Sequence, residues 1–231
     1  MQVSPEIQAQ WSEVDRALED WLAPADAALR GAIASATRAG LPAIAVAPAQ
    51  GRMLQVLARA IGARRILEIG TLAGYSAIWL ARGLPADGRL VTLELDPERA
   101  QIARENLARA GLSERCEVVV GPAADSLAAL VRANTPAFDM IFIDADKESC
   151  PRYLAHALEL ARTGSLVIVD NAISRGRIVD PATGDAGVNG LRTMMDIVSR
   201  HPRLEAAGVQ TVGAKGYDGF LIATVVDRRI Q

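Results

Sequence analysis

From Arg64 onward, short apolar runs alternate with amphipathic segments, and this alternation constrains the fold more than any other feature of the sequence. The runs have the length and aliphatic composition of buried strands, and the gaps between them can hold helices. Strands that alternate with helices in this way predict a parallel sheet covered by helices. We expect strands at about 65–69, 90–95, 116–120, 138–143 and 165–169, then a helix near 190–200 and two more strands at about 207–212 and 219–226.

Turn residues set the expected ends of several elements. The helix after Lys147 is predicted to end near Thr163 and Gly164. The segment Gly216-Tyr217-Asp218-Gly219 is predicted to be the turn before the last strand. Between Asn171 and Gly190 the sequence is rich in Gly, Asp and Arg, which predicts a long loop, and long ordered loops are usually functional.

The amino-terminal part reads as helical. One helix is expected after Ser4 and Pro5, a second from Pro24 to Gly40, and a third from about Pro48 to Gly62. The first helix carries a narrow apolar seam, which consists of Ile7, Trp11, Val14, Leu18 and Trp21. Such a seam must be covered, either by the core of the same chain or by a second copy. Because its two tryptophans favour an interface, we expect a homodimer. The expected organisation is one domain, with residues 1–62 as a helical extension and cap and residues 63–231 as a Rossmann-like core.

Composition excludes several classes of function. The net charge of this 231-residue chain is −2, so nothing indicates a phosphate-backbone footprint or a nucleic-acid partner. No apolar run approaches the ~18 residues that would span a bilayer, so no membrane partner is expected. The amino terminus lacks the layout of a signal peptide, and Cys116 and Cys150 do not suggest a disulfide framework. A reduced, cytoplasmic location is therefore the default.

The segment from Glu68 to Ser76 follows the first of these strands, where an open α/β sheet binds ligands. Gly70 and Gly74 allow a ligand close to the backbone, but the third glycine of the dinucleotide fingerprint is missing, which disfavours a nicotinamide dehydrogenase. An ordinary tight turn is the alternative. Glu94, near the end of the second strand, suits a carboxylate that binds a ribose, although Asp96 close by could simply cap a helix.

Asp144, Asp170 and Asn171 follow two later strands and offer only oxygen ligands. Hard oxygen donors favour Mg²⁺, Ca²⁺ or Mn²⁺ over zinc. The alternative is that the two aspartates cap the segments that follow them. Lys147 lies three residues beyond Asp144 and could be a solvated surface group. Beside a divalent cation and partly desolvated, its pKa should fall, which would make it a general base.

These segments, in this order, resemble the cation-dependent class I S-adenosylmethionine O-methyltransferases, which include the caffeoyl-CoA and catechol O-methyltransferases. The resemblance extends from Val46 to Phe220. It implies a Rossmann-like, seven-stranded, mostly parallel sheet with helices on both faces and an antiparallel last strand. It implies a metal held by Asp144, Asp170 and Asn171, with Lys147 and Asp144 catalytic. The cofactor-binding residues that it implies are Val46, Glu68, Gly70, Thr71, Gly74, Tyr75, Ser76, Glu94, Ala123 and Asp144.

Two departures from the family pattern concern the acceptor. A tyrosine often follows the Asp-x-Asp-Lys segment, where this chain has Cys150, although Tyr153 matches a second common tyrosine. The family also often shows Asp-Asn-x-Leu-Trp-x-Gly, whereas Ser174 replaces the tryptophan here. Since that tryptophan lies next to the acceptor pocket, the identity of the substrate stays open.

The sequence therefore predicts methyl transfer from S-adenosylmethionine to a small aromatic hydroxyl compound, a catechol or another vicinal diol. A divalent cation is expected to assist, with Mg²⁺ as the first expectation and Ca²⁺ or Mn²⁺ as alternatives. One competing hypothesis is a metal-independent methyltransferase of the same fold, acting on nitrogen or on a lone hydroxyl. Another is a non-catalytic S-adenosylmethionine-binding protein, which the joint presence of Asp144, Lys147, Asp170 and Asn171 argues against.

Overall fold

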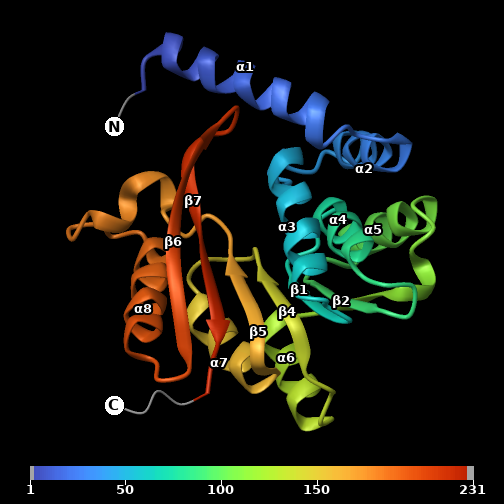
Figure 1. The fold of residues 1–231 in the computed structure, drawn as a ribbon, viewed down its shortest axis with the longest axis vertical. Coiled ribbons are helices and arrows are strands. Elements are labelled where there is room, and N and C mark those ends of the chain that lie inside the picture. Colours follow the sequence, from blue (N-terminus) through green and yellow to red (C-terminus); the bar gives the residue numbers. More distant parts are fainter. Residues whose placement is uncertain (1–2, 228–231) are drawn as a thin grey trace. The chain divides into compact units, whose positions relative to one another are not determined.

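The computed structural model describes residues 3–227 (Figure 1). The described chain forms two compact units, one made of Arg16–Ser126 and the other made of residues 3–15 together with residues 127–227. Helix α1 (Pro5–Leu22) contributes to both units. It begins as predicted, because the Ser4 hydroxyl accepts the N–H of Ile7 and Pro5 occupies the first helical position.

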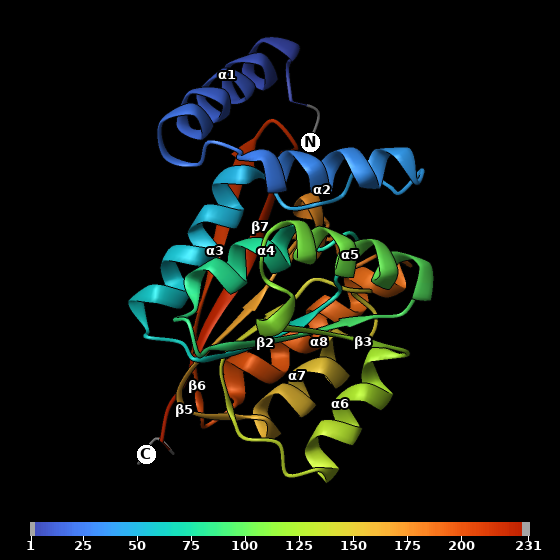
Figure 2. The ribbon, with the colours of Figure 1, turned by 90° about the vertical axis from the view of Figure 1, so that its right-hand side faces the viewer.

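The unit of residues 16–126 contains three parallel strands and the helices that connect them. Strand β1 pairs with β2, and β2 pairs with β3, both in parallel. Helix α3 packs on α4, and α2 contacts both α4 and α5 (Figure 2). The bounds are α2 (Ala27–Arg38), α3 (Pro48–Ala60), β1 (Arg65–Ile69), α4 (Tyr75–Gly83), β2 (Arg89–Glu94), α5 (Pro97–Arg109), η1 (Ser113–Arg115), β3 (Cys116–Val120) and α6 (Ala123–Arg132), which begins here.

The other unit contains four strands. Strand β4 pairs with β5 in parallel, whereas β7 is antiparallel to both β5 and β6. Every residue of β4 is buried, as expected for a strand of a parallel sheet covered on both faces. The bounds are β4 (Phe138–Ile143), α7 (Cys150–Glu159), β5 (Ala161–Val169), η2 (Ser174–Val179), α8 (Ala186–Arg200), β6 (Leu204–Gly213) and β7 (Gly216–Val225).

The strand order of the seven-stranded sheet is β3-β2-β1-β4-β5-β7-β6. Strands β1, β2 and β3 pair in parallel, as do β4 and β5, and the last strand of the chain, β7, is antiparallel to both of its neighbours. This arrangement confirms the predicted fold class. It also places the residues that follow β1, β2, β4 and β5 at the carboxyl ends of parallel strands, where ligands bind in such sheets.

The helix after Lys147 ends earlier than predicted, and this expectation was wrong. Helix α7 stops at Glu159, and the predicted helix end at Thr163 and Gly164 lies inside β5. A bulge explains the difference, because the β4–β5 register shifts between the pair Phe138–Ala161 and the pair Met140–Leu166. The Ser165 hydroxyl closes the bulge by accepting the N–H of Arg162 and donating to the carbonyl of Phe138.

The predicted turn at 216–219 was also wrong. Gly213 pairs with Gly216, so the turn of the β6–β7 hairpin consists of residues 214 and 215. Gly219 lies inside β7 for a packing reason, because a Cβ there would stand 2.2 Å from the carbonyl oxygen of Val209. The expected loop after Asn171 contains the short helix η2, and α8 begins at Ala186, where the Asp185 side chain caps it.

Helix α1 has no buried residue. Within its predicted seam, the exposed fraction is 45% for Ile7, 52% for Val14 and 75% for Trp21. In the described part of the chain, no helix has the length and apolarity needed to cross a membrane.

Candidate functional site

The turn from β1 into α4, residues 70–76, is called the cofactor turn below. It needs glycine at two positions, because Gly70 has a φ of +99° and Gly74 a φ of +80°. Gly74 also stands against α5, where an added Cβ would lie 3.3 Å from the Cβ of Ala103. The predicted residues Thr71, Tyr75 and Ser76 belong to this turn and to the first residues of α4.

Buried polar side chains on β1 and β2 support the cofactor turn. The Thr92 hydroxyl donates to Oε2 of Glu68 at 2.6 Å, and the hydroxyls of Thr71 and Thr92 lie 2.5 Å apart. Glu68 and Thr92 are fully buried. A buried carboxylate is costly unless it accepts hydrogen bonds, so this chain of contacts fixes Glu68 and links β1, β2 and the turn.

Glu94 also organises the cofactor turn. Its Oε2 atom accepts the N–H groups of Thr71 at 3.3 Å and Leu72 at 2.8 Å, while Oε1 accepts the N–H of Asp96 at 3.1 Å. The backbone carbonyl of Glu94 accepts the N–H of Gly121, two residues before Ala123. The predicted ribose carboxylate therefore lies beside both the cofactor turn and the Ala123 segment.

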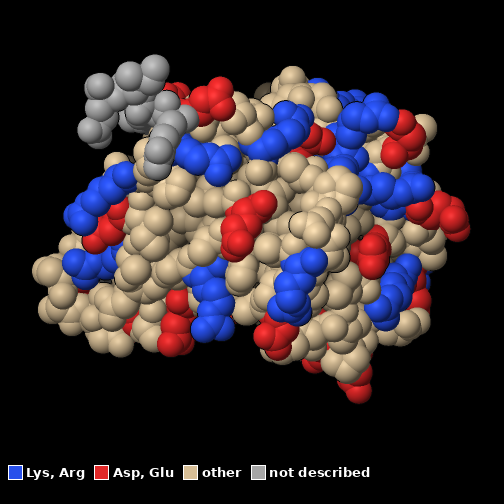
Figure 3. Space-filling view, turned by 90° about the horizontal axis from the view of Figure 1, so that it is seen from below, with Lys and Arg blue, Asp and Glu red and all other residues tan. Residues whose placement is uncertain are grey.

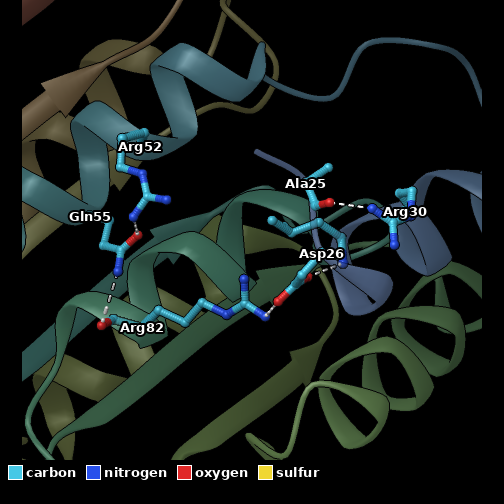
Figure 4. Close-up of polar contacts among 7 residues, drawn as sticks. Ala25, Asp26, Arg30, Arg52, Gln55 and Arg82 are labelled. Atoms are coloured by element: carbon cyan, nitrogen blue, oxygen red, sulfur yellow. Dashed lines mark hydrogen bonds and ion pairs between the residues drawn. The ribbon is translucent and has the colours of Figure 1, made fainter. Parts of the chain in front are cut away.

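Val46 is buried just before α3, and α3 packs on α4. Gly51 makes this packing possible, because a Cβ there would lie 2.3 Å from the Trp79 ring. A polar network joins the neighbouring helices (Figure 4). Gln55 of α3 donates to the carbonyl of Arg82 in α4, and the Arg82 side chain pairs with Asp26, which caps α2.

Sequence reasoning missed Asn106 on α5, which is 1% exposed. Its side-chain amide donates to the carbonyl of Ala73 in the cofactor turn at 2.8 Å and to the hydroxyl of Ser35 on α2 at 2.9 Å. Asn106 thus ties two helices to the turn. One feature of the sequence could have identified it, because Asn106 lies on the apolar face of a predicted helix. A side-chain amide that is buried there needs hydrogen-bond partners.

In the other unit, Asp144 and Asp170 follow the neighbouring parallel strands β4 and β5. Ile143 is paired with Val169, and the N–H of Asp170 donates to the carbonyl of Ile143 at 3.0 Å. The two predicted metal ligands are therefore brought together by the sheet register. Lys147 reaches back to Asp144, with 3.0 Å between Nζ and Oδ1. Asp144, Asp170 and Lys147 are called the acidic cluster below.

The pKa of Lys147 is raised above its ordinary value. Burial of the amine lowers the pKa, but the charge of Asp144 and its hydrogen bond raise it, as does the charge of Asp170. The fall in pKa that we expected for Lys147 concerns the protein with a cation beside the amine. Without the cation, the acidic cluster keeps this ammonium group protonated.

Asn171 and the residues after it adopt unusual backbone conformations. Asn171, Ser174 and Arg175 have φ values of +51°, +50° and +55°, a region that side chains other than asparagine rarely adopt. Arg177 braces this segment, because its guanidinium donates to the carbonyl and the hydroxyl of Ser174. Strained backbone of this kind often occurs at functional sites.

The donor set fits a hard divalent cation. Asp144 and Asp170 stand at adjacent strand ends, and Asn171 adds an amide oxygen directly after Asp170. Among the described residues 3–227, no group of three or more His, Cys, Asp or Glu side chains is arranged to hold a metal. The ligand set of Asp144, Asp170 and Asn171 stays a prediction, with two carboxylates and one amide oxygen as its donors.

Asp146, two residues after Asp144, has a different role. Its side chain accepts the N–H of Ser149 at 3.0 Å and the hydroxyl of Tyr153, which stabilises the turn before α7. Burial raises the pKa of Asp146, but these hydrogen bonds outweigh that effect and lower it. Sequence reasoning also missed Gly190, where a Cβ would lie 2.4 Å from the carbonyl oxygen of Lys147, so that only glycine lets α8 pack on this turn.

Known proteins resemble this chain over most of its length. The sequence model of the O-methyltransferase family matches residues 25–222. A catechol O-methyltransferase from Mycobacterium tuberculosis is 50% identical over 213 residues, which are 92% of this chain and 95% of that protein. The solved O-methyltransferase from Bacillus cereus, in complex with SAH, has a TM-score of 0.93 and 46% identity, and the match covers 94% of this chain and 99% of that one. A third similar protein is the O-methyltransferase TomG from Streptomyces achromogenes, which is involved in tomaymycin synthesis and was solved in complex with SAM. Its TM-score is 0.93 and its identity is 45%, and the match covers 95% of this chain and 99% of that one.

Proposed function

Because the chain belongs to the O-methyltransferase family and is an S-adenosylmethionine-dependent enzyme, we propose that its acceptor is a catechol or another aromatic vicinal diol and that a divalent cation assists the transfer. The observation that carries this proposal is the acidic cluster, in which two carboxylates and a lysine meet at the ends of β4 and β5. The name of the catechol O-methyltransferase from Mycobacterium tuberculosis supports the acceptor class.

In this proposal the unit of residues 16–126 supplies most of the cofactor contacts. The glycines of the cofactor turn let S-adenosylmethionine approach the backbone, with Thr71, Tyr75 and Ser76 beside it. Glu94 binds the ribose hydroxyls. A carboxylate has about four lone-pair sites, and three backbone N–H groups already donate to this one, so it can still accept a hydrogen bond from the ribose. The remaining contacts are assigned to Val46, Glu68, Ala123 and Asp144.

Asp144, Asp170 and Asn171 would hold the cation, for which Mg²⁺ is the first choice and Ca²⁺ or Mn²⁺ are alternatives. When bound, a divalent cation would polarise the hydroxyls of the acceptor and lower their pKa. It would also neutralise the charge of Asp144, which otherwise raises the pKa of Lys147. Asp170 is suited to this role because it is buried and because its backbone N–H donates to the carbonyl of Ile143, which fixes its backbone at the end of β5.

Lys147 takes the proton in this mechanism. The O–H bond of the reacting hydroxyl breaks, its proton passes to the neutral amine of Lys147, and the oxygen attacks the methyl carbon of S-adenosylmethionine. The bond between that carbon and the sulfonium sulfur breaks, leaving a neutral thioether. The contact between Asp144 and Lys147 orients the amine, so orientation and proton transfer supply the catalysis without a covalent intermediate.

A methyl-transfer screen tests the proposal. Catechols, flavonoids and hydroxycinnamates are offered with S-adenosylmethionine in the presence of Mg²⁺, Ca²⁺ or Mn²⁺, and again with EDTA. We expect transfer to vicinal diols only when a cation is present. Full activity in EDTA, or transfer only to amines or lone hydroxyls, would favour a metal-independent methyltransferase. Cofactor binding without any turnover would favour a protein that has kept affinity and lost catalysis.

The assembly is a further part of the proposal. The seam on α1 is exposed in the single chain, most strongly at Trp21, and a second copy of the chain would cover it. We expect a dimer mass by light scattering at micromolar concentration. Trp21→Glu should shift this mass toward the monomer, whereas Gln10→Glu on the same helix serves as the control. A monomeric wild-type protein would refute the dimer.

Charge and cysteine usage support the remaining assignments. On the face that Figure 3 shows, basic and acidic side chains are interspersed, and the net charge of the chain is −2. Both features fit a small-molecule substrate better than a nucleic-acid partner. Within the described chain both cysteines, Cys116 and Cys150, are free thiols, as is usual in the cytoplasm, where we place the reaction.

A further inference from the structure

The tip of the β6–β7 hairpin is held in place by the beginning of the chain. The Gln8 side-chain amide donates to the carbonyl of Gly213 at 2.9 Å, and the N–H of Ala214 donates to Oδ2 of Asp15 at 2.7 Å. Gly213 is packed so closely that a Cβ there would lie 2.2 Å from the same oxygen. All these residues belong to one compact unit, and Figure 1 shows the hairpin extending toward α1. The position of Lys215 is therefore defined by several contacts.

This hairpin projects past the acidic cluster. Leu221 pairs with Val169 at the end of β5, and the N–H of Ala172 donates to the carbonyl of Gly219. From Gly219 the strand continues to Gly216, which at ~3.3 Å per residue places the tip about 10 Å further on. Lys215 thus stands beyond the carboxyl end of β5, the end at which Asp170 and Asn171 lie.

The distribution of lysine in the chain points to the same place. Of the 25 basic residues only two are lysines, Lys147 and Lys215, and the rest are arginines. Burial lowers the pKa of Lys215, and the charges of Asp170 and Asp144 oppose that effect, which means that both carboxylates act on this ammonium group. Lys147 contacts Asp144, and Lys215 is an exposed residue at the hairpin tip beyond the end of β5. Each of these side chains carries a compact ammonium charge on a flexible stem.

We propose that Lys215 is a specificity residue that binds a carboxylate on the acceptor, so that the enzyme selects catechols with a carboxylate arm over neutral catechols. The inference rests on the proposed function, because it assumes that the diol of the acceptor lies at the acidic cluster. In the protein alone, two lysines balance two carboxylates. A divalent cation at Asp144 and Asp170 would leave excess positive charge, which favours an acceptor that brings negative charge of its own.

The test compares three acceptors with the same diol: catechol, 3,4-dihydroxybenzoate and 3,4-dihydroxyphenethylamine, which carry no arm charge, a carboxylate and an ammonium group. For Lys215→Met we expect kcat/KM to fall about tenfold or more for the carboxylate acceptor, the size of a partly screened charge-assisted hydrogen bond, and to stay within about twofold for catechol. Lys215→Arg should retain most of the preference. Lys215→Glu should shift it toward the ammonium acceptor.

The matched control is Arg200→Met, which removes a cation near the start of β6, at the far end of the hairpin from the tip. Equal losses for all three acceptors in Lys215→Met, or a wild-type enzyme that does not prefer the carboxylate acceptor, would overturn the proposal. Either outcome leaves the proposed function intact as long as the wild-type enzyme methylates catechol.

A binding measurement keeps the proposal testable without turnover. Calorimetry of 3,4-dihydroxybenzoate with the protein loaded with S-adenosylhomocysteine and Mg²⁺ should show affinity weakened about tenfold by Lys215→Met and not by Arg200→Met. Unchanged affinity in Lys215→Met would overturn the role of this residue. Failure to methylate any of the three acceptors would overturn the proposed function, and the calorimetric comparison would then still decide whether Lys215 binds the carboxylate.

Discussion

The cofactor turn and the acidic cluster both lie at the carboxyl ends of parallel strands, but they hold their polar groups differently. In the cofactor turn, Glu94 accepts three backbone N–H groups and Glu68 is fully buried with a hydroxyl donating to it. In the acidic cluster, Asp144 contacts the ammonium group of Lys147, and both side chains remain about a fifth to a quarter exposed. The cofactor turn is thus held in one shape, which suits a cofactor that many enzymes share. The Asp144–Lys147 ion pair can exchange partners, which suits a site where a reaction takes place.

The largest expected effect comes from the carboxylates of the acidic cluster. Asp144→Ala or Asp170→Ala should abolish metal-dependent methyl transfer, a loss of at least about 100-fold, since even residues that only support metal ligands are worth about 10–100-fold. Binding of S-adenosylmethionine, measured by calorimetry, should remain largely intact. Asp146→Asn is the matched control, because that carboxylate contacts Ser149 and Tyr153. Full activity of Asp144→Ala in EDTA would eliminate the metal scheme.

Removal of the proposed base comes next. Lys147→Ala should lower kcat by roughly 10²–10⁴-fold while metal and cofactor still bind. Burial lowers the pKa of Lys147 and Asp144 raises it, with a raised value as the result, so the neutral amine becomes more populated as pH increases. The wild-type rate should therefore rise with pH. The variant should lose this dependence but recover in part at high pH, where the diol ionises by itself.

The control for this experiment is Lys147→Arg, which keeps a positive charge but cannot accept a proton. If the arginine variant were as active as the wild type, the charge of Lys147 would be its contribution and the base would have to be another group.

The cofactor turn should respond through affinity. Glu94→Ala removes hydrogen bonds to a charged group, worth about 1.5–3 kcal/mol each, so affinity for S-adenosylmethionine should fall at least about tenfold. Because Glu94 also holds Thr71 and Leu72, thermal stability should fall with it. Glu98→Ala, an exposed carboxylate nearby, should change neither quantity. Calorimetry that shows unchanged affinity for Glu94→Ala would refute the assignment.

The smallest effect is expected for Asp146, which sharpens the contrast with Asp144. Asp146→Asn should cost about 1 kcal/mol or less, because the side chain is partly exposed, and lower Tm by roughly 2–4 °C at neutral pH. The folded-state pKa of Asp146 is lowered, so its contribution is present above the unfolded value near ~3.9 and disappears as pH falls through the folded value. The gap in Tm between the two proteins should close in acid. A gap that persists at low pH would mean that the carboxylate charge is irrelevant.

Much of this architecture could be predicted, because glycine, proline and apolar runs act locally. Helix α5 starts at Pro97 after the Asp96 cap, and Gly111 follows its end with a φ of +70°. What failed depended on partners distant in sequence. Residues 163 and 164 look like a helix end, but Ser165 closes a bulge against the carbonyl of Phe138. Gly219 looks like a turn residue, but it is required by the neighbouring Val209 backbone.

In the candidate site too, some features could be predicted from the sequence and others depend on partners distant in sequence. Asp144 and Asp170 could be predicted to converge, because parallel strands bring their carboxyl ends to one edge of a sheet. Asn106 and Gly190 could not be assigned, because their roles depend on which helix packs against which turn. The positive φ of Ser174 and Arg175 also carries no local signature, since neither residue type favours that region.

The contacts of Gln8 and Asp15 with the β6–β7 hairpin connect residues 205 and 199 positions apart, which has a consequence for biosynthesis. At ~5–20 residues per second, a ribosome needs roughly 10–40 s to make the chain between these partners. During that time the first half of α1 has no docking site, and its apolar face is open to chaperones or to another nascent chain. Closing so long a loop is a slow step, so the amino-terminal helix should be among the last parts of this unit to gain protection from hydrogen exchange during folding.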